Sequence, residues 1–323
     1  MTDNLRSKPA EPAKYSGAGA TDVGLKREHN EDTFLCRPDL GLFLVADGMG
    51  GHRAGAYAST LAAESIERFF ENTEVDWDPD GLPSDCRDIE SDAARLVLAI
   101  RKANDAVVAA SSENPLRRGM GTTVVAVYLS ANGMIHIAHV GDSRCYRIGI
   151  SDIEQLTQDH SFLNNVKWSQ PGIDDDMMAV IPKNIITRAL GTRDAVEVEV
   201  RSELTLPGDA YLLCSDGLSG LVPASVILEV VESIDEPMGV CTELIERANR
   251  AGGKDNVSVV VVRIAEREDT LPNLVSSAVS GIENTRLRYD QELGKWVCSM
   301  CGREHVEGTA FCVECGTALL YKS

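Results

Sequence analysis

The sequence predicts an α+β layered sandwich, with strands in the centre and helices on the outside. Short apolar runs of strand length recur along the chain, for example at residues 42–46 and 257–264. Between such runs lie stretches with apolar residues at helical spacing, at 53–72, 93–107 and 223–250. Strand runs that alternate with helix pairs place the sheets inside and the helices on their outer faces.

Length and charge limit the possible functions. The 323 residues can hold one large domain and an accessory unit. The net charge of -19 argues against a general binder of nucleic acid or of an anionic membrane, and it suits a user of divalent cations.

Localisation is predicted to be cytoplasmic. No apolar run reaches the roughly 18 residues of a membrane span, and the N-terminal segment lacks the apolar core of a secretory signal. Five scattered cysteines are expected to be reduced core residues: Cys36, Cys86, Cys145, Cys214 and Cys241.

The first half of the chain begins with a flexible tail at residues 1–14. The polar segment 18–34 suggests a strand-loop-strand hairpin that leads to the apolar strand 42–46. Two amphipathic helices follow, and the acidic stretch 71–92 between them is interpreted as a solvated loop. Asn132-Gly133 is a strong turn signal and predicts a hairpin of two strands on either side.

The second half contains an irregular segment at 162–186, interpreted as an insertion or flap. The alternating V-E-V-E-V at 196–200 predicts a half-exposed edge strand. A strand at 210–216, two helices and a last buried strand complete the domain, and residues 266–295 are interpreted as a linker.

Acidic residues follow three of the apolar runs. Asp47 ends L-F-L-V-A-D-G, Asp142 follows a second run in V-G-D-S, and Asp216 ends L-L-C-S-D-G. A single Asp-Gly is most often an ordinary turn. Three acids at strand ends, far apart in sequence, instead suggest one shared site, where glycines leave room for a ligand to approach the backbone.

Eight short motifs then occur in a fixed order. They are T-D-V-G-L-K-R-E-H-N-E-D, V-A-D-G-M-G-G-H, G-M-G-T-T, V-G-D-S-R, L-T-Q-D-H-S, I-T-R-A-L-G, C-S-D-G-L and G-K-D-N-V-S. Over residues 15–265 the chain resembles the metal-dependent protein phosphatases of the 2C type, in particular their bacterial branch. The resemblance implies a four-layer α-β-β-α sandwich. It also implies hydrolysis of phosphoserine and phosphothreonine by water activated at two or three manganese or magnesium ions.

The resemblance also implies roles for individual residues. Asp47 would bridge two ions, and Asp216 and Asp255 would complete one of them; these three form the predicted catalytic set. The Gly48 carbonyl and Glu31 would serve the other ion. Further roles are assigned as follows: Asp142 with Asp216 for a third ion, Arg27 for the substrate phosphate, and Asp32 and Asn256 for orienting water or neighbouring ligands.

Two positions depart from relatives. Met49 stands where animal members have a histidine that is a proposed general acid, and His52 is out of register, so neither is assigned a proton-transfer role. In the segment 162–186, Ile181 precedes Pro182 where bacterial relatives often have a histidine. Control of substrate choice and of a third metal by this segment is therefore not carried over.

The C-terminal residues 296–319 contain a second motif. Cys298 and Cys301, then Cys312 and Cys315, form two C-x2-C pairs at the spacing of a structural zinc site. The unit resembles a small zinc ribbon with one zinc ion, and two disulfides are the less favoured reading. Residues 285–323 hold five Lys/Arg and five Asp/Glu, and this lack of a basic surplus favours protein over nucleic acid as a partner.

The leading hypothesis is a serine/threonine protein phosphatase that opposes a kinase, with phosphorylated proteins as partners. Two other classes stay open. A catalytically silent phosphoprotein-binding scaffold should have lost metal carboxylates, yet Asp47, Asp216 and Asp255 are present. A two-metal hydrolase of small phosphate esters or nucleotides would use the same residues.

Overall fold

The computed structural model describes residues 15–50, 53–73, 77, 82–169, 181 and 185–265, and strands at 287–290, 295–298 and 304–305. The chain divides into two compact units, residues 1–266 and 267–323. Several predictions fall on residues outside this description: the tail 1–14, His52, much of the segment 162–186, most of the linker, and Cys301, Cys312 and Cys315.

The first unit contains two antiparallel sheets. Sheet I has the order β1 (Tyr15–Asp22), β11 (Val257–Ile264), β10 (Ala210–Cys214), β7 (Arg144–Gly149) and β8 (Asp152–Gln155). Sheet II has the order β2 (Asp32–Arg37), β3 (Leu42–Met49), β5 (Val124–Leu129), β6 (Met134–Val140) and β9 (Glu199–Leu204), and β4 (Gly121–Thr122) pairs with β3.

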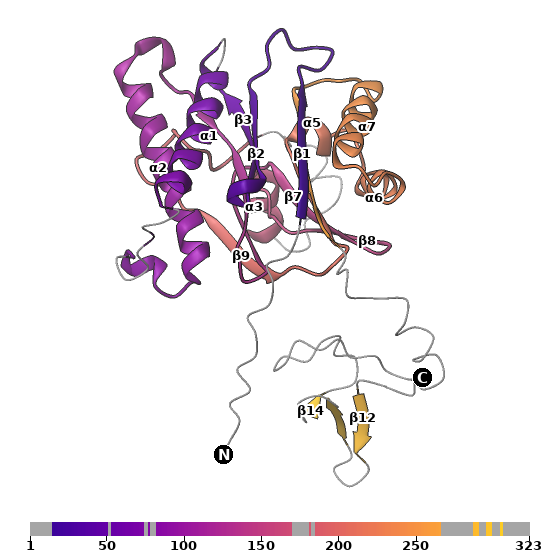
Figure 1. Ribbon diagram of the computed structural model, residues 1–323. Coiled ribbons are helices and arrows are strands. Elements are labelled where there is room, and N and C mark those ends of the chain that lie inside the picture. The colour runs from indigo at the N-terminus through magenta and orange to yellow at the C-terminus, as the bar shows by residue number, and fades with distance from the viewer. Residues whose placement is uncertain are drawn as a thin grey trace. The chain divides into compact units, whose positions relative to one another are not determined.

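Helices cover the outer faces of both sheets (Figure 1). On sheet II lie α1 (Ala54–Asn72) and α2 (Ser91–Glu113), and on sheet I lie α5 (Asp216–Ser219), α6 (Ala224–Ser233) and α7 (Pro237–Arg250). The remaining helices are α3 (Phe162–Ser169) and the short 3-10 helices η1 (Pro38–Leu40), η3 (Ser84–Cys86) and η4 (Pro115–Arg117). The predicted α+β sandwich of central strands and outer helices is confirmed.

Strand β3 shows why the run 42–46 consists of apolar residues only, rather than alternating apolar and polar ones. Leu42 and Leu44 pack against α1 and α2, whereas Phe43 and Val45 point to the space between the sheets. These four side chains are fully buried, and each such burial stabilises the fold by about 1.5–3 kcal/mol. Because both faces of β3 are covered, its end is held rigidly at the edge of the sandwich.

The predicted hairpin at 18–34 is wrong. β1 pairs with β11 of sheet I, and β2 pairs with β3 of sheet II, so the two strands belong to different sheets. Glycines in β1 allow the sheets to approach, since a Cβ on Gly19 would lie 2.5 Å from the Phe34 ring. The connection 23–31 therefore crosses from one sheet to the other.

Most other elements agree with the sequence. The helices at 53–72 and 223–250 and the hairpin around Asn132-Gly133 are confirmed. The irregular segment from 162 instead begins with helix α3, and the edge strand β9 starts at Glu199, later than the V-E-V-E-V pattern. The cysteines of the first unit are free, and all but Cys36 are buried.

The described part of the second unit is a small antiparallel sheet. β12 (Leu287–Asp290), β13 (Lys295–Cys298) and β14 (Glu304–His305) pair in that order, with β13 in the centre. β12 falls inside the stretch that the sequence assigns to the linker. Among the helices that the structure describes, none combines the length and the apolar character needed to cross a membrane.

Candidate metal centre

Strand pairing brings the predicted acids to one edge of the sandwich. In sheet I, the end of β10 lies opposite the start of β11, so Asp216 and Asp255 flank neighbouring strand ends. In sheet II, Asp47 of β3 lies directly opposite Asp32 of β2. Asp142 follows β6, immediately before β7, whose first residue pairs with Cys214. Antiparallel pairing, rather than proximity in sequence, creates the cluster.

The carboxylates repel one another in a poorly solvated environment. Burial, followed by the charges of Asp32, Asp216 and Asp142, raises the pKa of Asp47 well above its ordinary value. Burial and the charge of Asp216 raise the pKa of Asp142 to about 7. Burial also raises the pKa of Asp216, and that of Asp32 to about 6. These are the shifts expected of clustered acids that lack a positive partner.

Several of these oxygens also have no hydrogen-bond donor. Among the described residues, four buried carboxylate oxygens in this region accept no hydrogen bond: Glu31 Oε1, Asp32 Oδ1, Asp142 Oδ1 and Asp216 Oδ1. An unpartnered buried carboxylate is costly unless a cation or donor compensates it. Carboxylate oxygens are the ligands that manganese and magnesium prefer, so the residues present fit hard divalent cations.

Gly48 fixes the position of Glu31 beside this cluster. The Gly48 amide donates to the Glu31 carbonyl over 3.1 Å. A Cβ on Gly48 would lie 2.2 Å from the Gly55 carbonyl oxygen and 2.5 Å from that of Glu31, so a side chain does not fit. The end of β3, the crossing segment and the start of α1 are thereby held together.

The two predicted supporting residues each contact neighbours of the acids. The Asn256 side chain accepts a hydrogen bond from the Glu31 amide at 2.9 Å and donates to the carbonyls of Val23 and His29 at 3.0 Å. It therefore anchors the crossing segment. Asp32 accepts a 2.7 Å hydrogen bond from the Ser215 hydroxyl, which in turn accepts one from the Ser258 amide at 3.0 Å.

Sequence reasoning missed two hydroxyl residues, Ser215 and Thr123. The Thr123 hydroxyl accepts from the Asp47 amide at 3.0 Å and hydrogen-bonds the Ser143 hydroxyl at 2.7 Å. The Thr123 amide also donates to the Asp47 carbonyl at 2.8 Å. Thr123 lies in the motif G-M-G-T-T and Ser215 lies in C-S-D-G-L. Their presence in these motifs is the sequence signal that could have identified them as site residues.

The turn that carries Asp142 is clamped by the D-H-S motif. Gly141 donates its amide to His160 Nδ1 at 3.1 Å and accepts from the His160 amide at 2.9 Å. Arg144 binds the Asp159 carboxylate at 2.7 Å. Asp159 and His160 therefore form an edge of the site, while the Ser161 hydroxyl accepts from the Asn164 amide in the first turn of α3.

The histidines of β6, His136 and His139, are packed side chains. His139 is buried, stacks on His160 with ring centroids 4.7 Å apart, and hydrogen-bonds the Gln158 carbonyl at 2.8 Å. His136 is fully buried and hydrogen-bonds the Ser202 hydroxyl at 2.9 Å. Burial lowers the pKa of both rings, so both are neutral at pH 7.

Arg27 has a partner that the sequence did not predict. Its Nη2 donates to Asp255 Oδ2 at 2.7 Å, with side chains 50% and 33% exposed. A guanidinium carries five N–H donors, so this ion pair leaves others free. Arg27 also lines a groove of about 970 Å³ together with Glu31, Arg53, Tyr57 and Arg117. We call it the α1–η4 groove.

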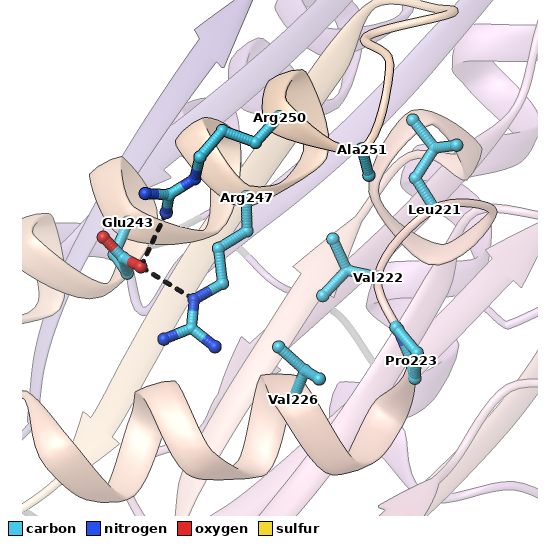
Figure 2. Close-up of a pocket in the computed structure, with 8 residues that line it drawn as sticks. All are labelled: Leu221, Val222, Pro223, Val226, Glu243, Arg247, Arg250 and Ala251. Carbon is cyan, nitrogen blue, oxygen red and sulfur yellow. Dashed lines mark hydrogen bonds and ion pairs between the residues drawn. The ribbon is translucent and has the colours of Figure 1, made fainter.

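A second pocket, of about 510 Å³, lies between α6, α7 and the segment after α5, and contains none of the clustered acids. Figure 2 shows Glu243 between Arg247 and Arg250, which bind it at 2.7 and 2.9 Å. Its arginines are thus neutralised within the protein. The α1–η4 groove, in contrast, adjoins the carboxylate cluster directly.

Comparisons with known proteins agree with this geometry. Residues 25–255 match the family described as protein phosphatase 2C. The serine/threonine phosphatase stp of Listeria monocytogenes is 36% identical over 245 residues, which cover 75% of this chain and 93% of that protein. The chain belongs to the protein phosphatase 2C family, and is accordingly an enzyme of the phosphoprotein phosphatase class.

Two solved structures resemble the first unit. The serine/threonine phosphatase PstP/Ppp of Mycobacterium tuberculosis superposes with a TM-score of 0.66 at 34% identity, over 78% of this chain and 99% of that one. The catalytic domain of PstP in complex with two manganese ions gives a TM-score of 0.65 at 33% identity, over the same shares of the two chains.

Proposed function

We propose that this chain hydrolyses phosphoserine and phosphothreonine in proteins at a manganese or magnesium centre built on the strand-end acids. The observation that carries the proposal is the cluster of buried carboxylates with raised pKa values and unpartnered oxygens. The structure of PstP with two manganese ions supports a two-metal centre in this fold. Kinase targets are the expected protein substrates.

The residues fall into three groups by proposed task. Asp47, the Gly48 carbonyl, Glu31, Asp216 and Asp255 would hold two ions, and Asp142 with Asp216 would hold a third. When bound, such ions polarise an attacking water and neutralise the phosphoryl oxygens. Thr123 keeps the Asp47 backbone in place, and Asn256 keeps that of Glu31.

Arg27 would bind the substrate phosphate through the donors that Asp255 leaves free. Met49 cannot transfer a proton, because a thioether has no acidic hydrogen. We therefore assign no side chain as the general acid, and the chain's proposed contribution is binding, orientation and charge.

The test is release of phosphate from a panel of phosphoserine and phosphothreonine peptides, with manganese, with magnesium and with excess chelator. Turnover that requires metal and favours peptides over nucleotides and small esters is the expected result. Full activity in chelator would overturn the metal centre. A strong preference for nucleotides would favour the alternative of a small-ester hydrolase.

We further propose that Cys298, Cys301, Cys312 and Cys315 hold one structural zinc ion in a module that binds protein. The C-x2-C spacing supports this, and the described strand β13 ends at the first of these cysteines, Cys298. Residues 285–323 hold five basic and five acidic side chains, which gives no basic surplus for nucleic acid. Zinc content of the purified chain, compared with its Cys298→Ser variant, tests the site.

A further inference from the structure

The α1–η4 groove extends from the candidate metal centre along the start of α1. Arg27 and Glu31 line one part of it. Arg53 and Tyr57, at the start of α1, and Arg117, in η4, line another. Its volume of about 970 Å³ lies at the top of the range of roughly 300–1,000 Å³ that small-molecule sites occupy. A phosphoryl group beside Arg27 would leave most of this space for the rest of a substrate.

Two arginines of the groove have no acidic partner among the residues that the structure describes. Within the described part of the chain, neither Arg53 nor Arg117 forms an ion pair, whereas Arg247 and Arg250 of the second pocket share Glu243. The acids that line the groove are Glu28 and Glu31, and Glu31 belongs to the proposed metal centre. The part of the groove between α1 and η4 is therefore positively charged, in a chain whose net charge is -19.

Arg117 is already held in position for an anion. Its guanidinium lies over the Tyr57 ring, 3.7 Å from the centroid, so one face is occupied while its N–H edges stay available. Asn114 fixes the backbone of η4, since its side chain accepts from the Leu116 amide at 3.0 Å. Leu116 is 89% exposed beside this arginine and offers an apolar contact.

We infer that the α1–η4 groove binds the residues that flank the phosphorylated serine or threonine, and that it selects an anionic side chain there. The anion is a carboxylate or a second phosphate bound by Arg53 and Arg117, with an apolar neighbour against Leu116. This inference rests on the proposed function and names its substrate class: acidic phosphoprotein segments rather than basic ones.

The test compares phosphothreonine peptides that differ only in their flanks. One peptide has neutral flanks, two carry paired glutamates on the N-terminal or the C-terminal side, one carries a phosphoserine, and one carries paired lysines. For the full chain with manganese, we expect kcat/KM for at least one anionic peptide to exceed that for the neutral one by about two- to fivefold, in the range of partly exposed ion pairs. The glutamate and phosphoserine arms separate the two sources of the anion.

The double variant Arg53→Gln/Arg117→Gln should remove this preference. Arg118→Gln is the control for a charge lost outside the groove: Arg118 is exposed in the same loop and does not line the groove, and its variant loses one positive charge where the double variant loses two. Thermal melting of each variant checks folding. An unchanged ratio in the double variant, or an equal loss in the control, would overturn the inference.

Binding of the same peptides, fluorescently labelled, separates the groove from the chemistry. Anisotropy with the Asp47→Asn chain needs no turnover, so it reports on the groove even where no peptide is hydrolysed. Tighter binding of an anionic peptide, lost in the arginine double variant, supports the inference. Equal binding of neutral, acidic and basic peptides contradicts it, whatever the outcome for phosphatase activity.

Discussion

Arg27→Ala should change substrate use and metal binding in opposite directions. Arg27 donates to Asp255 at 2.7 Å, and Asp255 is a proposed metal ligand. A bound cation and the guanidinium therefore compete for one carboxylate. Removing the guanidinium should make Asp255 more available to manganese, while it removes a donor from the substrate phosphate.

The structure sets the size of both effects. The two side chains are 50% and 33% exposed, so the ion pair belongs with surface pairs worth about 0.2–1 kcal/mol. Manganese affinity should therefore rise by no more than about fivefold. A charged hydrogen bond to phosphate is worth about 1.5–3 kcal/mol, so kcat/KM should fall roughly 10- to 150-fold, mainly through KM.

Steady-state kinetics on one phosphothreonine peptide and calorimetric titration with manganese measure the two effects separately. Arg27→Lys is the matched control: it keeps the charge but lacks the planar fork, so it should recover only part of the substrate binding. A fall in manganese affinity that matches the kinetic loss would refute this reasoning, because Arg27 would then support the metal centre itself.

Three further predictions concern the metal centre, the buried His136 of β6 and the second unit. Asp47→Asn should lower kcat by at least about 100-fold, as expected for loss of charge stabilisation. In chelator the variant should melt at a temperature no lower than wild type, because the substitution removes a buried charge that neighbouring acids repel. A clear loss of thermal stability would contradict this. Burial lowers the pKa of His136 to about 4, whereas an unfolded histidine titrates near 6.5. The unfolded chain then binds more protons below pH 6.5, so this group should cost at most about 2 kcal/mol of stability on going from pH 7.5 to pH 5, since the Glu90 carboxylate, 3.1 Å from its Nε2, favours the protonated ring. Urea melts should show His136→Gln losing about that much less than wild type over the same interval, and equal losses would show that His136 is not held neutral. Truncation after residue 268 should keep activity on small phosphopeptides and remove one zinc per chain, since thiolates hold zinc and the carboxylate site holds exchangeable hard cations. Loss of activity on a small aryl phosphate would instead show that the second unit completes the catalytic domain.

Local sequence patterns predicted most helices and strands, because the apolar face of each element can be recognised from the spacing of apolar residues within a short stretch of sequence. The run 42–46 is apolar throughout since helices cover one face of β3 and the opposite sheet covers the other. Asn132-Gly133 determines its hairpin because the turn geometry is local. The acids at strand ends could also be identified as site residues, because each of them directly follows an apolar run in the sequence.

Pairing between distant strands could not be predicted in the same way. The segment 18–34 looked like a hairpin because two strand patterns flank a polar loop. The pairing of β1 with β11 and of β2 with β3 shows that the strands belong to different sheets, which approach each other where Gly19 faces Phe34. The ion pair of Arg27 with Asp255 likewise joins residues 228 positions apart, and no local pattern encodes it.

Net charge alone gives a misleading picture of what this surface attracts. A charge of -19 would repel an acidic phosphoprotein if all charges acted together. At physiological ionic strength, however, the Debye length is about 8 Å, so exposed charges act mainly on their immediate surroundings. A substrate segment in the α1–η4 groove would experience Arg27, Arg53 and Arg117 first. Local arrangement of three arginines can therefore decide substrate preference against the sign of the whole chain.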